Sequence, residues 1–145
     1  MVDKLQQDLK DAQIARDETR VSTLRLLLSE VKNAEIAKGT DLLDEDIVSL
    51  VQKEVKKRKE AAVGFRSGGR EEQAQKEEAE AKILQAYLPA QLSNEELTKI
   101  IEESITEVGA KSIQDMGRVI GVVMGKVRGQ AEGGMISALV KEKLS

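Results

Sequence analysis

The chain has 145 residues, of which 40% are hydrophobic and 34% charged, and its 23 Lys and Arg against 26 Asp and Glu give a net charge of −3. It has no Cys and no His, which excludes a thiolate nucleophile, a Ser–His pair, a Cys/His zinc site and an imidazole general base. Aromatic residues make up only 1%, so the core must consist of Leu, Ile, Val, Ala and Met.

The composition favours a protein without a membrane segment. The N-terminus is charged from Asp3 onward and does not resemble a signal peptide. No run approaches the ~20 apolar residues that a membrane-spanning helix needs. The absence of Cys fits a reducing compartment. We therefore expect a cytoplasmic protein with no membrane contact, no metal and no cofactor.

Four helices are predicted before the only proline, over residues 3–16, 18–38, 44–67 and 70–88. In each of them apolar residues recur every three or four positions, which is typical of a helix with one buried face. The predicted buried residues are Leu5, Leu9, Ala12, Ile14, Val21, Leu24, Leu27, Leu28, Val31, Ala34, Ile47, Leu50, Val51, Val55, Ala62, Phe65, Ala74, Ala81, Leu84 and Leu88.

Pro89 marks the predicted domain boundary, because proline disfavours helical geometry at the preceding residue and lacks a backbone donor. After it, about three helices are predicted, with Leu97, Ile100 and Ile101 on a buried face. The chain is therefore predicted to be all-α, with an N-terminal domain of about four helices over residues 1–89 and a small C-terminal domain of about three helices over residues 90–145.

Several helix ends carry recognisable signals. Gly39 and Gly109 are expected to end helices in a left-handed conformation. Asp44 is expected to be an N-cap, and Ser93 with Glu96 forms a capping box. Ser112 and Asp115 have a similar spacing and are expected to open the helix that follows residue 110.

Charged runs in the N-terminal half are interpreted as solvated helix faces. The basic run 53–59 is diluted by Glu54, and two pairs at (i, i+4) spacing, Glu72–Lys76 and Glu78–Lys82, are each expected to add only ~0.2–0.5 kcal/mol. Neighbouring carboxylates on a helix point in different directions and do not converge on a metal or on a substrate. No catalytic residue is predicted.

The segment 112–134 combines exposed backbone, apolar residues and positive charge. Glycines recur at every fourth position, at Gly117, Gly121, Gly125 and Gly129. Each glycine inside a helix costs ~1 kcal/mol relative to Ala, so they need a reason. The favoured interpretation is close packing between two short helices, and the alternative is approach of the backbone to a phosphate or to another helix.

The cations of this segment are the candidate functional residues. Together with the glycine turn they are predicted to form a phosphate-binding surface, and the alternative interpretation is ordinary surface charge. The predicted nucleic-acid-binding residues are Lys111, Arg118, Lys126, Arg128, Gly129, Gln130, Gly133, Gly134 and Lys141.

The chain resembles the GatB/YqeY domain family over essentially its full length. The resemblance is carried by YLPAQLSNEEL from Tyr87, by DMGRVIGVVMGKVRGQAEGG from Asp115 and by the ending ISALVKEKLS from Ile136. It implies a helical protein whose C-terminal part is similar to the tail domain of the B subunit of glutamine-dependent tRNA amidotransferases, which are carbon–nitrogen ligases.

This resemblance implies a partner but no reaction. We expect a non-catalytic accessory protein that contacts tRNA, or a complex containing aminoacyl-tRNA. The alternative is a helical protein-interaction module or homodimer with no RNA role. Four positions depart from the family pattern. Gln130 replaces a usual cation, and Glu132 is a poorer N-cap than Asp or Asn. Gly125 stands where relatives often have Pro, and Ser137 where Asn is common.

Overall fold

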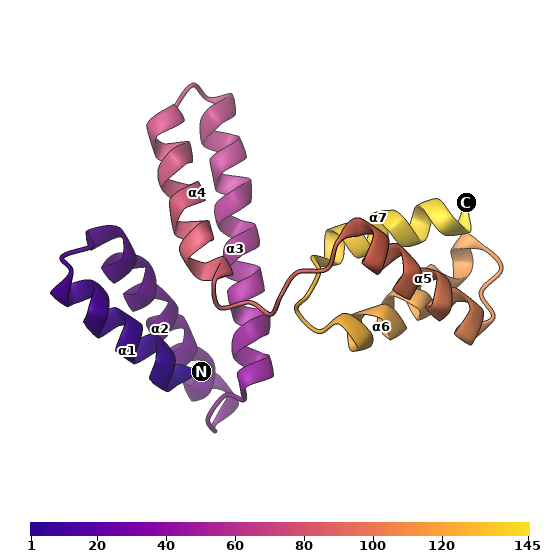
Figure 1. Cartoon of the computed structure of the whole chain (residues 1–145), viewed down its shortest axis with the longest axis horizontal. Helices are drawn as coiled ribbons and strands as arrows, with labels where there is room; N and C mark the ends of the chain where they lie inside the picture. Colours follow the sequence, from indigo (N-terminus) through magenta and orange to yellow (C-terminus); the bar gives the residue numbers. More distant parts are fainter. The chain divides into compact units, whose positions relative to one another are not determined.

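The computed structural model describes all 145 residues, and it is all-α, as the sequence predicts (Figure 1). Seven α-helices and one short 3-10 turn make up the chain. They are α1 (Val2–Ile14), α2 (Glu18–Lys38), α3 (Asp44–Ser67), α4 (Glu71–Gln85), α5 (Asn94–Val108), η1 (Ile113–Asp115), α6 (Met116–Val127) and α7 (Gly133–Leu144).

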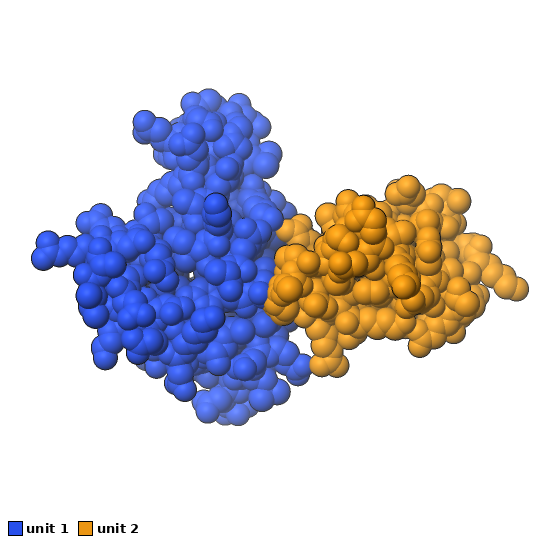
Figure 2. Space-filling model, viewed as in Figure 1, with its two compact units in different colours: residues 1–88 blue, residues 89–145 orange.

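The chain divides into two compact units, Met1–Leu88 and Pro89–Ser145 (Figure 2). Each unit has its own aliphatic core. In the N-terminal unit the core includes Leu5, Leu24, Leu27, Ile47, Val51 and Leu84, and in the C-terminal unit it includes Leu97, Ile101, Val119, Val123, Ile136 and Val140. That each unit is a domain able to fold alone stays a prediction.

In the N-terminal unit, α1 packs on α2, and α3 and α4 form an antiparallel hairpin whose base contacts α2 (Figure 1). Most of the apolar residues predicted to face inward are buried or half-buried there. Ile14 is an exception, because its side chain is 78% exposed at the end of α1. The turn that follows, with Arg16 at φ 57°, carries the chain into α2.

The ends of α2 and α3 follow the expected physics, with one correction. Asp17 caps α2 by accepting a hydrogen bond from the Arg20 N–H, and Gly39 ends it at φ 80°. The N-cap of α3 is Leu43 rather than Asp44. The reason is that the Asp46 carboxylate accepts from the backbone N–H of Leu43 at 3.0 Å, which places the start of the helix one residue earlier.

The α3–α4 hairpin holds an arginine between its helices. Arg58 donates to Glu54 on its own helix at 2.9 Å and to Glu80 on α4 at 3.2 Å, and all three side chains are only 11–12% exposed. The lysines of the basic run 53–59 are exposed, as predicted for a solvated face, whereas Arg58 points inward.

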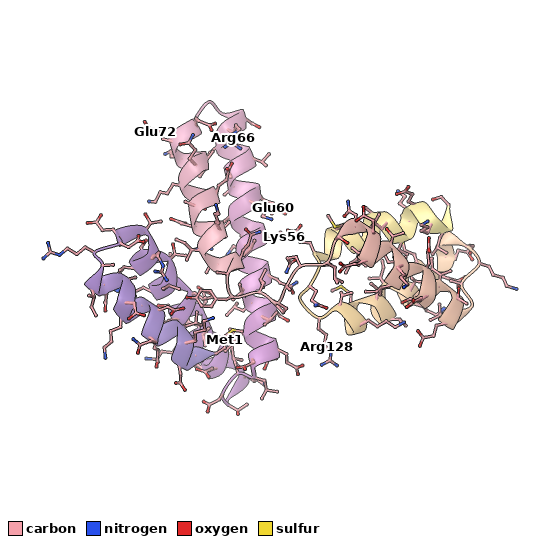
Figure 3. The ribbon with its side chains drawn as sticks, in the orientation of Figure 1. Met1, Lys56, Glu60, Arg66, Glu72 and Arg128 are labelled. Carbon is pink, nitrogen blue, oxygen red and sulfur yellow. The ribbon has the colours of Figure 1, made fainter.

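A second arginine joins the two helices near the loop end of the hairpin (Figure 3). Arg66 pairs with Glu71 at 2.8 Å and with Glu78 at 2.5 Å. The (i, i+4) spacing predicted a pair between Glu78 and Lys82 on the same helix. Glu78 pairs instead with Arg66 across the hairpin.

In the C-terminal unit, α5 begins at the predicted N-cap with one of the two hydrogen bonds of the capping box, and it ends as predicted. The Ser93 hydroxyl accepts from the N–H of Glu96, and Gly109 ends the helix at φ 69°. The next helix differs from the prediction, because Ser112 makes no side-chain cap and the chain first forms the turn η1. Asp115 instead accepts from the backbone N–H of Lys111 at 3.0 Å, and α6 starts at Met116.

Candidate nucleic-acid interface

The turn between α6 and α7 is the centre of the predicted surface, and the linker before α5 holds it in place. The backbone N–H of Leu92 donates to the carbonyl of Gln130 at 2.9 Å, and the Gln91 side chain donates to the carbonyl of Gly129 at 3.0 Å. Ala131 is buried in the core beneath the turn. These contacts fix the backbone of residues 128–131, although the turn contains no regular structure.

Arg128 occupies an unusual conformation at the end of α6. Its φ is 25°, in the left-handed region that residues with a side chain rarely adopt, and Gly129 follows at φ 85°. The exposed Arg128 side chain donates to the carbonyl of Gly125 at 3.2 Å (Figure 3). A strained backbone that holds a charged side chain at the surface is a feature that clusters at functional sites.

The first turn of α7 leaves its backbone donors without a side-chain cap. The N-cap is Glu132, whose side chain makes no capping hydrogen bond, and the helix opens with Gly133 and Gly134. A side chain at Gly133 would meet only the methyl group of Met124, at 4.0 Å, and one at Gly134 would meet nothing within 4 Å. A helix start of this kind attracts anions through its free N–H groups and its dipole.

The glycines inside α6 do not pack against another helix, so the favoured interpretation of their spacing is wrong. A methyl group added at Gly117, Gly121 or Gly125 would meet nothing within 4 Å. The physical reason is that the opposite side of α6 is the buried one: Val119, Val123 and Val127 face the core. The glycines therefore form a bare, solvent-facing side of the helix.

The predicted cations do not form one patch, because they lie at opposite ends of their helices. Arg118 is in the first turn of α6 and Arg128 follows its last turn, and at 1.5 Å per residue ten residues of helix span ~15 Å. Lys141 is in the last turn of α7, about 12 Å along the axis from Gly133. The residues that the fold brings together are those of the turn: Arg128, Gly129, Gln130, Gly133 and Gly134.

Two of the candidate cations already have carboxylate partners. Arg118 pairs with Asp115 at 2.7 Å, and Lys126 pairs with Glu107 on α5 at 2.6 Å. Lys111 and Lys141 are exposed and make no ion pair. The pairs are on the surface, where an ion pair contributes about 0–1 kcal/mol, so an external anion can replace the carboxylate.

The pKa of Asp115 is set by groups within four residues of it in the sequence. The backbone N–H of Lys111, followed by the Arg118 guanidinium, holds the pKa of the Asp115 carboxyl below its usual value of 3.8. On α7, Lys143 pairs with Glu102 at 2.8 Å, and this carboxylate raises the pKa of the Lys143 ammonium. Both ion pairs lie on the surface of the unit.

Sequence reasoning missed the residues that hold the turn in place. Neither Gln91 nor Leu92 carries a signal for a contact nearly forty residues away. Glu107 was also missed as the partner of Lys126, because the crossing of α5 and α6 that brings them together is a tertiary feature. No group of three or more acidic side chains is arranged to hold a metal ion, and no helix is both long and apolar enough to cross a membrane.

Comparison with known proteins identifies the family. The model of the family described as "Yqey-like protein" matches residues 2–144. The protein named "Altered inheritance of mitochondria protein 41, mitochondrial" of Eremothecium gossypii is 40% identical over 87 residues, which are 59% of this chain and 48% of the relative. Its namesake in Pyrenophora tritici-repentis is 32% identical over 133 residues, or 88% of this chain and 71% of the relative.

A third relative of that name, from Vanderwaltozyma polyspora, is 33% identical over 110 residues, or 74% of this chain and 60% of the relative. The chain thus spans about half of the first relative and more of the other two.

These relatives contradict the prediction of a cytoplasmic protein, because their names describe them as mitochondrial. The prediction rested on the absence of Cys and of long apolar runs, and neither property specifies a compartment. The match over nearly the whole chain shows that this protein belongs to the Yqey-like protein family.

Proposed function

We propose that this protein is a non-catalytic accessory protein that binds tRNA, or a complex that carries tRNA, through the turn from Arg128 to Gly134. The observation that carries the proposal is the convergence of an exposed arginine and the uncapped start of α7 on a turn held by Gln91 and Leu92. The resemblance to the amidotransferase tail supplies the kind of partner. The exposed Lys111, Arg118 and Lys126 are secondary contacts in this proposal.

The proposed contact is with the sugar–phosphate backbone. The C-terminal unit contains no Phe, Trp or Tyr, so it has no aromatic side chain on which a base could stack. A backbone contact of this kind reads the shape of a folded RNA. With two or three phosphates neutralised, binding should weaken about tenfold to fortyfold between 50 and 200 mM salt.

A matched pair of glycine substitutions tests the proposal. Gly134 and Gly117 are each the second residue of a helix, and both have open space around them. Gly134→Asp should stabilise α7, because a carboxylate in the first turn complements the dipole, and should abolish tRNA binding by repelling phosphate. Gly117→Asp adds the same charge to the start of α6 and should leave most of the binding intact.

Fluorescence anisotropy with labelled tRNA at ~50 and ~200 mM salt measures the tRNA binding of both variants, and circular dichroism checks their fold. Loss of binding in Gly117→Asp with retention in Gly134→Asp would move the site to the other end of α6. An absence of salt-sensitive binding by the wild type would refute direct tRNA binding.

A protein ligand is the second candidate, and the exposed methionines next to the turn favour it. Met124 and Met135 are exposed, and the Met124 side chain lies against Gly133. Methionine adapts its shape to different partners. Met124→Ser/Met135→Ser should then abolish capture of a protein from a nuclease-treated lysate, whereas tRNA binding, which depends on phosphate contacts, should persist.

A further inference from the structure

Helix α2 has large apolar residues on two sides, only one of which faces the core. Its inner side buries Leu24, Leu27 and Val31. Its outer side is exposed and yet includes Leu26, which is 53% exposed, and Ile36, which is 71% exposed. The exposed row that contains them, here called the α2 seam, consists of Ser22, Leu26, Ser29, Asn33 and Ile36.

The spacing of the α2 seam is that of a coiled coil. Its members follow one another at intervals of four, three, four and three residues, which places Leu26 and Asn33 at a positions of a heptad and the other three at d positions. No charged residue interrupts the row, although 34% of the chain is charged. An Asn at an a position favours pairing of two parallel helices in one register.

The charges that flank the seam select both the occupant and its direction. Arg25 and Lys32 occupy g positions on one side, and Glu30 occupies an e position on the other. Arg25 and Glu30 are exposed and make no ion pair within the chain. In a parallel pair of identical helices, Arg25 of each copy lies opposite Glu30 of the other. In an antiparallel pair the side with Arg25 and Lys32 would face itself.

From this complementarity we propose that the protein forms a parallel homodimer through the α2 seam. The two-fold axis runs along α2, with Leu26, Asn33 and Ile36 each packed against the same residue of the second copy. The serines at two d positions bury little apolar area, so the dimer is weak, with a dissociation constant of about 10 μM to 1 mM.

Charge reversal tests the pairing. Sedimentation equilibrium of the nuclease-treated full chain should show a monomer–dimer equilibrium. Arg25→Glu and Glu30→Arg should each raise the dissociation constant about tenfold, because two attractive pairs become repulsive. The double variant Arg25→Glu/Glu30→Arg should restore the wild-type value. Leu26→Asp should remove the dimer, and because Leu26 is exposed, helicity should stay unchanged.

Three outcomes would overturn the proposal. The first is a wild-type chain that is monomeric at ~1 mM. The second is a dimer that survives Leu26→Asp, which would place the contact elsewhere. The third is tighter association of Arg25→Glu, which is the result that an antiparallel pair predicts.

Cysteine cross-linking tests the direction independently, and the chain has no Cys of its own. A disulfide requires Cα atoms about 4.4–6.8 Å apart. In the parallel dimer, Ser22→Cys and Ile36→Cys should both oxidise readily to covalent dimers. Ser49→Cys, exposed on α3, is the control and should not. Cross-linking of only one seam position would contradict the parallel register.

Discussion

The α3–α4 hairpin and the start of α6 contain arginine–carboxylate pairs of nearly the same length in different surroundings. Arg58 lies 2.9 Å from Glu54 and is 11% exposed, whereas Arg118 lies 2.7 Å from Asp115 and is 62% exposed. The distances would suggest equal strength. Burial makes the difference: an unpaired charge is costly inside a hairpin and is readily solvated at the surface.

The same contrast holds for the polar groups of the two units. In the N-terminal unit, polar groups such as Arg58 and Tyr87 hold elements together from the inside. In the C-terminal unit the core is aliphatic apart from Ser104, whose hydroxyl donates to the Ile100 carbonyl of its own helix, and the ion pairs lie on the surface, where partners can be exchanged. The predictions that follow test this contrast, beginning with the largest expected effect.

Arg58→Ala should destabilise the protein by about 3 kcal/mol, because it leaves the largely buried Glu80 without a cation and leaves Glu54 with only the more distant Lys57, at 3.7 Å. Arg118→Ala is the control and should change the free energy of unfolding by less than ~1 kcal/mol. Urea unfolding of the full chain, followed by far-UV circular dichroism, measures both. Similar losses in the two variants would refute the contrast between the units.

Tyr87→Phe should cost about 1.5 kcal/mol, the second largest effect. The Tyr87 ring is 8% exposed, and its hydroxyl donates to Asp8 on α1 at 2.5 Å. Urea unfolding gives the loss of stability, and Asp8→Asn, which keeps an acceptor, should lose less.

The same contact makes a spectroscopic prediction. Burial, and then the charge of Asp8, raise the pKa of the Tyr87 hydroxyl above its usual value of 10.0. Since Tyr87 is the only tyrosine, absorbance titration reads it directly, and Asp8→Asn should lower its apparent pKa. Ionisation near the usual value in the wild type would show that the contact is absent in solution.

The elements and most of their ends could be predicted because their signals are local. Gly39 and Gly109 end helices at positive φ, and Ser93 caps α5, all through contacts within one turn. Arg58 and the contact between Leu92 and Gln130 could not be predicted, because they depend on how separate helices pack.

The candidate site was predictable only in part, for the same reason. In the sequence, Arg118, Arg128 and the glycines lie in one segment, 112–134. In the structure, the length of α6 separates Arg118 from the turn that contains Arg128. The solvent-facing direction of the α6 glycines depends on which side of the helix is buried, and the valines of α6 fix that side.

Gly121→Ala should raise the free energy of unfolding by about 0.5–1 kcal/mol, because alanine is the better helix former and the site is open. Gly109→Ala has equally open surroundings but a φ of 69°, so it should destabilise by about 1 kcal/mol. Thermal unfolding of the two variants gives the comparison. Destabilisation by Gly121→Ala would mean that something covers the bare side of α6 in solution.

The smallest effect concerns pH and Asp115. Because its pKa is lowered in the folded state, the ionised carboxylate stabilises the fold at neutral pH, and this contribution is lost as the pH falls through and below 3.8. The stability difference between the wild type and Asp115→Asn should therefore be larger at about pH 7 than at about pH 3, as measured by urea unfolding. A constant difference would contradict the lowered pKa.

Salt distinguishes the two causes of that shift. The backbone N–H of Lys111 is the larger cause and is insensitive to screening, whereas the contribution of the exposed Arg118 guanidinium should fall as ionic strength rises. Raising the salt concentration should therefore reduce the pH dependence only in part. If so, Arg118 gains little from Asp115 and can exchange it for an external phosphate, whereas Arg58 has no such freedom because its partners are buried with it.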